Sequence, residues 1–243
     1  MAGEAGRQYE RDVYNRMNRA GVVPEGFSVA GTNPHAPDMQ FLSNGGLTYN
    51  LELKNDTPGL LDFGQGTLQY TGSSWELSGD KTAAAEKMRD LLRGLGVLNV
   101  VTTNWTAVPH KRTRQSVTKA EAIQDIINFP DINAPANVSD VISYYNRKDT
   151  FYIQIEKLGL YYMGINPAGI PAIPELSGTF EVRVRRKPTG STREDPALTA
   201  VLPAGRRAKL PNPPGSYRFT TAFICTSPPG ASPIDLDNIL DWL

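Results

Sequence analysis

Residues 37–54, PDMQFLSNGGLTYNLELK, predict two short strands joined by a turn. The strands are expected from Asp38 to Leu42 and from Thr48 to Lys54. Between them, Asn44-Gly45-Gly46 is typical of a hairpin turn. A hairpin of this length places the start of the first strand beside the end of the second.

Side chains alternate between the two faces of a strand. In the second strand this puts Asn50, Glu52 and Lys54 on one face and Leu51 and Leu53 on the other. The polar face then carries an acid and a base that point the same way. Since Asp38 begins the neighbouring strand, the hairpin can bring its carboxylate to that of Glu52.

Two neighbouring carboxylates repel each other unless a cation lies between them, and ligation by oxygen alone favours Mg²⁺ or Mn²⁺. Lys54 would then orient or deprotonate a water, or stabilise negative charge in a transition state. Each residue also has a structural explanation. A Glu-x-Lys pair is common on an exposed strand, and an Asp after a proline is often a turn residue. Their joint appearance in this order favours a metal site formed by Asp38 and Glu52.

A helix is expected over roughly residues 4–20, because Glu10, Val13, Tyr14 and Met17 follow the i, i+3, i+4, i+7 spacing of one helical face. Glu10 therefore lies in the inward stripe. A Glu early in a helix can also serve only to interact with the positive N-terminal end of the helix dipole. A further strand is expected near residues 27–30.

Downstream, the Gly-rich stretch 58–74 is interpreted as a loop with short structured pieces. A second helix follows residue 80 and ends near Gly94 and Gly96, and a strand is expected from Val97 to Thr102. The order helix, three-strand meander, helix, strand describes an α/β unit of about a hundred residues.

The rest of the chain predicts a helical connection and then a β-rich part. Thr118 and Glu121 form a capping box ahead of a third helix. Strands are expected over residues 151–156, 160–165, 179–186 and 217–226. We therefore divide the chain into a core (1–105), a helical connection (106–150) and a β-rich extension (151–243). The extension is a subdomain for DNA binding or dimerisation, or it continues the first sheet.

Composition narrows the class of protein. The chain has 243 residues, a net charge of zero and one cysteine, Cys225, which excludes a disulfide framework and a cysteine metal cluster. No run is long and apolar enough for a signal peptide or a membrane span. We therefore expect a cytoplasmic protein.

Basic residues cluster in two places. One cluster is Lys111, Arg112, Arg114 and Lys119. The second lies between residues 183 and 209 and includes Arg183, Arg185, Arg186, Lys187, Arg206 and Arg207. Either cluster alone is consistent with solvated loops. Beside a metal site that acts on phosphates, both become candidate phosphate contacts.

These residues resemble the PD-(D/E)XK, or restriction-endonuclease-like, nucleases. The resemblance rests on Pro37-Asp38 followed by Glu52-Leu53-Lys54, with a helical glutamate in Gly6-Arg7-Gln8-Tyr9-Glu10-Arg11. Within that superfamily the first half looks most like archaeal-type Holliday junction resolvases and related phage nucleases, which share a small polar loop before Pro-Asp, here Gly31-Thr32-Asn33. The resemblance covers residues 6–102 and implies an α/β, restriction-endonuclease-like core.

The resemblance also implies roles for individual residues. Asp38, Glu52 and the Leu53 carbonyl would bind Mg²⁺ or Mn²⁺, Lys54 would position the attacking water, and Glu10 would support a metal or its waters. Thr32 and Asn33 would lie near a phosphate. Some branches add a Gln-x-x-x-Tyr motif, but here Tyr70 falls one place late after Gln65, so an exonuclease is not indicated. Gln65 and Gln69 are candidates for DNA contact, with a plain loop role as the alternative.

Two hypotheses follow. The first is a metal-dependent endonuclease that hydrolyses DNA, structure-specific like the resolvases or of phage type, and working as a homodimer because a cut in both strands needs two sites or two steps. The second is a non-catalytic nucleic-acid-binding or virion assembly protein with a nuclease-like fold.

Overall fold

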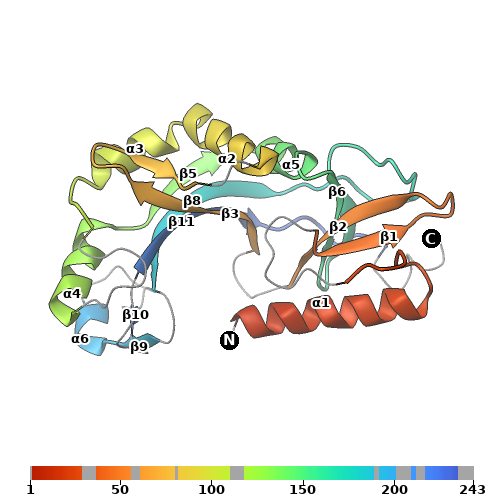
Figure 1. Ribbon diagram of the computed structural model, residues 1–243, viewed down its shortest axis with the longest axis horizontal. Helices are drawn as coiled ribbons and strands as arrows, with labels where there is room; N and C mark the ends of the chain where they lie inside the picture. Colours follow the sequence, from red (N-terminus) through yellow and green to blue (C-terminus); the bar gives the residue numbers. More distant parts are fainter. Residues whose placement is uncertain are drawn as a thin grey trace.

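The computed structural model describes residues 2–28, 37–55, 61–79, 82–109, 118–188, 192–200, 209–211 and 217–234. It is a mixed α/β structure with two main sheets (Figure 1). The helices are α1 (Ala2–Arg19), α2 (Ala83–Gly94), α3 (Val97–Asn104), α4 (Lys119–Asn128), α5 (Val138–Asn146) and α6 (Pro196–Thr199). The strands are β1 (Met39–Leu42), β2 (Thr48–Lys54), β3 (Leu61–Tyr70), β4 (Trp75–Leu77), β5 (Ile132–Ala136), β6 (Thr150–Ile155), β7 (Gly159–Tyr162), β8 (Thr179–Pro188), β9 (Thr192–Glu194), β10 (Lys209–Pro211) and β11 (Tyr217–Ser227).

The first sheet has four strands in the order β1-β2-β6-β7. The β1–β2 hairpin is antiparallel, as residues 37–54 predict, and β2 runs parallel to β6. Helix α1 lies along this sheet (Figure 1) and buries Val13 and Met17 against Leu51 and Leu53. The inward stripe predicted for this helix is therefore confirmed. Residues 27 and 28 are not in a strand, and the rest of the strand expected there lies outside the described residues.

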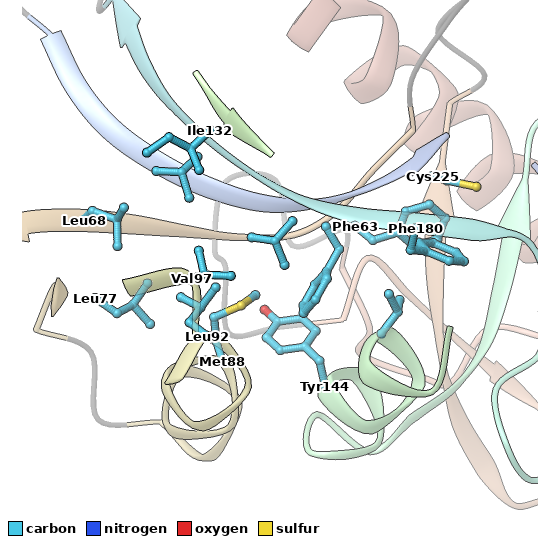
Figure 2. Close-up of a cluster of buried hydrophobic side chains, with 14 of the residues drawn as sticks. Phe63, Leu68, Leu77, Met88, Leu92, Val97, Ile132, Tyr144, Phe180 and Cys225 are labelled. Atoms are coloured by element: carbon cyan, nitrogen blue, oxygen red, sulfur yellow. The ribbon is translucent and has the colours of Figure 1, made fainter. Parts of the chain in front are cut away.

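The second sheet has five antiparallel strands in the order β4-β3-β11-β8-β5. Helices α2, α3 and α5 cover one face of it (Figure 1), and the main hydrophobic core lies between (Figure 2). Phe63, Leu68, Val182 and Phe223 point from the sheet into this core. A separate two-stranded sheet, formed by β9 and β10, lies beside α6 and α4 (Figure 1).

Two further local predictions were wrong. Residues 61–70 form β3 and not a loop. The strand lacks a regular alternation in sequence because Gly64, with φ of +54°, lies at a shift in the β3–β11 register. The segment from Val97 is helix α3 and not a strand, since Val97, Leu98 and Val101 share one buried helical face. A short apolar run does not distinguish a strand from a buried helix by periodicity alone.

Two predictions for the later part of the chain are confirmed. The capping box of Thr118 and Glu121 begins α4, and the four strands expected after residue 150 are present as β6, β7, β8 and β11. Strands β6 and β7 continue the first sheet, and β3 joins β11 in the second. Both sheets thus combine strands from the first 105 residues with strands from beyond residue 150. The division of roles among the three predicted segments stays a prediction.

Among the described residues, the longest and most apolar helices fall short of what a membrane span needs.

Candidate active site

Glu52 is a buried charge in β2, with 5% of its surface exposed. Its Oε1 accepts hydrogen bonds from Lys54 Nζ at 2.6 Å and from the Tyr145 hydroxyl at 3.0 Å. Its Oε2 lies 3.6 Å from Lys148 Nζ, within ion-pair distance, and has no hydrogen-bond donor among the described residues. Glu52 is therefore held by cations while one oxygen keeps the capacity to accept another ligand.

Asp38 immediately precedes β1, and its Oδ2 accepts the backbone N–H of Leu53 at 3.0 Å. The β1–β2 pairing ends with Met39 opposite Leu51, so this carboxylate takes the place that a longer β1 would occupy beside Leu53. In a strand, the N–H and C=O of one residue point to the same side. The Leu53 carbonyl therefore also points to the side on which Asp38 lies.

The carboxyl groups of Asp38 and Glu52 differ in acidity. Burial, followed by repulsion from Glu52, raises the pKa of Asp38 to about 6. Burial alone would raise the pKa of Glu52 as well, but the charges of Lys54 and Lys148 outweigh it and hold that pKa below its usual value. At neutral pH both groups are ionised, and the negative charge on Asp38 is the less well compensated of the two.

Lys54 is a protonated amine at neutral pH. Burial alone would lower its pKa, but the charge of Glu52 and other neighbouring groups raise it well above the usual value. Its Nζ lies 5.9 Å from the centre of the Phe63 ring, and it donates a hydrogen bond to Glu52. Glu52 is therefore the strongest partner of this amine. Lys54 therefore acts in this geometry as a fixed cation.

Glu10 reaches the same group of charges from α1. It is partly buried, and burial first, then the charge of Asp38, raises its pKa, while Lys54 lowers it. The structure thus brings together all four residues that the sequence singled out, Glu10, Asp38, Glu52 and Lys54.

The residues suit an oxygen-preferring divalent cation. Among the described residues, no group of three or more His, Cys, Asp or Glu side chains has the spacing of a metal cage. Mg²⁺ does not require one, because it is usually bound by one or two carboxylates together with waters and substrate phosphates. Asp38, the open Oε2 of Glu52 and the Leu53 carbonyl provide such a set.

Two further members of the site, Tyr145 and Lys148, were not predicted to lie beside Glu52. The Tyr145 hydroxyl donates to Glu52 and accepts the backbone N–H of Gly64 at 3.1 Å, so it ties β2 to β3. Lys148 follows α5 and pairs with Glu52. Both come from about 95 residues downstream, and only the parallel pairing of β2 with β6 brings them here.

The predicted DNA contacts are only partly within the described residues. Arg183, Arg185 and Lys187 alternate along β8 and share the face opposite the core. Arg183 and Arg185 both pair with Asp62 of β3, at 3.2 and 3.4 Å. Gln65 and Gln69 are exposed on β3. The others lie outside the described residues: Thr32, Asn33, Lys111, Arg112, Arg114, Arg206 and Arg207.

Arg186 is separated from this group. It points to the opposite face of β8, where its guanidinium lies 4.0 Å from the centre of the Tyr217 ring and donates to the Ala122 carbonyl. Burial lowers its pKa. The geometry makes Arg186 a packing residue between β8, β11 and α4.

No protein-family model and no curated protein matches this sequence. A solved structure that aligns with nearly all of it is that of HhaI endonuclease in complex with DNA, with a TM-score of 0.41 and 10% identity over 95% of this chain and 94% of that chain. At this identity and TM-score the likeness says nothing about the roles of individual residues.

Proposed function

We propose that this chain is a metal-dependent endonuclease that hydrolyses phosphodiester bonds in DNA. The observation that supports this most is the arrangement of Asp38, Glu52 and Lys54. Two carboxylates act on each other's charge, and a protonated amine is hydrogen-bonded to one of them. The same three residues carry the sequence resemblance to PD-(D/E)XK nucleases.

Asp38, Glu52 and the Leu53 carbonyl would hold Mg²⁺ or Mn²⁺, and Glu10 is a further candidate ligand for the ion or its waters. When bound, such an ion polarises a phosphoryl oxygen and lowers the pKa of water. Asp38 is the ligand most favoured by an incoming cation, because its charge is less well compensated than that of Glu52 and its pKa of about 6 leaves it ionised at neutral pH.

Lys54 would hold the attacking water or stabilise negative charge on the phosphoryl oxygens. It does not take a proton in this proposal, because its raised pKa keeps it protonated. Glu52 fixes the Lys54 amine at 2.6 Å, and Tyr145 fixes Glu52. Tyr145 is therefore a positioning residue and Lys54 a catalytic one.

The face of β8 that carries Arg183, Arg185 and Lys187 would contact the DNA backbone. Positive side chains lie close together on this face. Burial first, and then repulsion from Arg185 and Arg218, lower the pKa of Lys187. Asp62 compensates only part of this positive charge, because it pairs with Arg183 and Arg185. A polyanion would relieve the remaining repulsion.

A cleavage assay tests the proposal. The chain is incubated with linear, nicked, single-stranded and four-way-junction DNA in Mg²⁺ or Mn²⁺, and cleavage should stop in chelator, in Asp38→Asn and in Lys54→Met. Lys87→Met, on α2 outside the site, serves as the matched control and should cut normally. Circular dichroism verifies that each variant is folded. Failure of the folded native chain to cut all four substrates would contradict the proposal.

The preferred substrate in that panel reports whether the enzyme is structure-specific, as in resolvases. A homodimer would place two sites on the two strands of a duplex, and sedimentation of the chain with and without DNA measures this directly. One cut per binding event would favour a monomer that nicks.

One observation favours the alternative, a non-catalytic nucleic-acid-binding protein. Lys54 and Lys148 already compensate the charge of Glu52, as they would in a purely structural ion cluster. In that case Asp38→Asn would leave DNA binding unchanged and no metal would raise the melting temperature of the native chain.

A further inference from the structure

A cavity of about 420 Å³ opens next to the candidate active site. It lies between β3, the beginning of α2 and the end of α5, and Figure 2 shows Leu77, Met88 and Tyr144 of its wall on the helix side of β3. Its volume falls within the range of small-molecule sites and exceeds what an inorganic phosphate needs.

Lys148 joins the cavity to the active site, because the same side chain lines the cavity and lies 3.6 Å from Glu52 Oε2. A ligand in the cavity would therefore be a direct neighbour of whatever Glu52 and Asp38 hold. The link depends on one side chain that is mostly buried, with 15% of its surface exposed.

The cavity wall is cationic. Arg147 and Lys148 come from the end of α5 and Arg218 comes from β11, and none of the described lining residues is acidic. Arg147 and Arg218 are exposed and have neither a side-chain hydrogen bond nor an ion pair with any described residue. Lys148 is paired with Glu52, whereas Arg147 and Arg218 add positive charge that no described side chain pairs with.

The rest of the wall is divided between polar and apolar groups. Gln65, Thr67 and Thr220 offer side-chain hydrogen-bond donors and acceptors, while Leu77 and Met88 supply a buried apolar floor. The first turn of α2 adds backbone N–H groups that favour an anion. A ligand that fits this wall has an anionic end and a flat or apolar end.

We propose that the cavity binds one nucleotide of the substrate strand, with its phosphate among Arg147, Lys148 and Arg218 and its base against the apolar floor. The proposal rests on the function proposed above, since it places this nucleotide next to the phosphodiester to be cut. It goes further by assigning a nucleotide subsite to Arg147 and Arg218, which neither the sequence motif nor the metal site includes.

The test measures binding without cleavage. A fluorescein-labelled, 5′-phosphorylated single-stranded oligonucleotide is titrated in chelator and followed by fluorescence anisotropy at several salt concentrations. Arg147→Gln and Arg218→Gln should each weaken binding about tenfold and reduce the salt slope by about 0.7. Arg93→Gln, an exposed arginine of α2 outside the cavity, is the matched control and should change little.

A second variant separates the cavity from general surface charge. Thr67→Trp adds a large side chain to the cavity wall at an exposed strand position without changing any charge, and it should weaken binding to a similar extent. Loss of affinity in the arginine variants with full affinity in Thr67→Trp would overturn the proposal, because it would show charge attraction alone. Unchanged affinity in all three variants would also overturn it.

Competition with a free deoxynucleoside monophosphate distinguishes two forms of the site. Displacement of the oligonucleotide would show that a single nucleotide is sufficient, and no displacement at millimolar concentration would assign the cavity to a nucleotide within a strand. A chain that binds in this way but never cuts DNA would keep the subsite and refute the nuclease. A chain that cuts DNA with all cavity variants unaffected would do the reverse.

Discussion

Replacement of Asp38 by Asn should stabilise the folded protein at neutral pH while it removes a proposed metal ligand. The amide oxygen of Asn can still accept the Leu53 N–H, so the variant removes the charge and keeps the hydrogen bond. The rise in the pKa of Asp38 from 3.8 to about 6, at about 1.4 kcal/mol for each pH unit, corresponds to about 3 kcal/mol. An amide is a weaker acceptor than a carboxylate, so we expect a net gain of about 2 kcal/mol.

The sign of this effect sets its pH dependence. The folded state raises the pKa of Asp38, so folding favours the protonated form and the native chain loses stability as the pH rises from about 4 through 6. Asn does not titrate. The difference in unfolding free energy between variant and native chain should be small at pH 4 and reach its full value near pH 7.

Urea unfolding in chelator at pH 4 to 8 measures this difference. Asp90→Asn, at an exposed position on α2, is the control and should give a small difference at every pH. Added Mg²⁺ should stabilise the native chain and not Asp38→Asn, because the ion binds the folded state. An Asp38→Asn variant that is no more stable than the native chain at pH 7, or a gain that does not vary with pH, would refute the reasoning.

Three further predictions follow from the same site. Mg²⁺ affinity, measured by calorimetry, should fall up to about tenfold for each pH unit below 6, because protons compete for Asp38; a flat profile from pH 7 to 5 would contradict this. Tyr145→Phe should cost about 1–3 kcal/mol in urea unfolding, because it removes the acceptor of the Gly64 N–H and a donor to Glu52, and an unchanged midpoint would show that the hydroxyl is dispensable. Gly64→Ala should cost about 2 kcal/mol or more, since its Cβ would lie 2.6 Å from Tyr144 Cε1 at a positive φ, whereas Gly45→Ala should be nearly neutral.

The local part of the site could be predicted from sequence because it depends on short-range geometry. Alternation along β2 places Glu52 and Lys54 together, and a three-residue turn sets Asp38 beside Leu53. The helical spacing around Glu10 is equally local. These relations hold within a few residues of the chain, where the periods of strand and helix apply directly.

The remainder depends on packing between distant segments. Tyr145 reaches Glu52 across 93 residues, and nothing near position 145 indicates that its hydroxyl will contact β2. The helix that begins at Val97 also depends on packing. Burial of Val97 and Val101 on one face of this helix overrides the strand preference of β-branched residues. The placement of Arg186 against Tyr217, away from its neighbours in sequence, follows from the same alternation that unites Arg183 and Arg185, once the buried face of β8 is known.

The parallel pairing of β2 with β6 has a consequence for synthesis of the chain. Glu52 leaves the ribosome long before Tyr145, and at about 5–20 residues per second the interval for 93 residues is roughly 5 to 20 s. During that time Asp38, Glu52 and Lys54 have neither β6 beside them nor α5 above them. The proposed catalytic centre therefore matures late, and a nascent chain that stops before β6 carries the motif without the means to hold it in place.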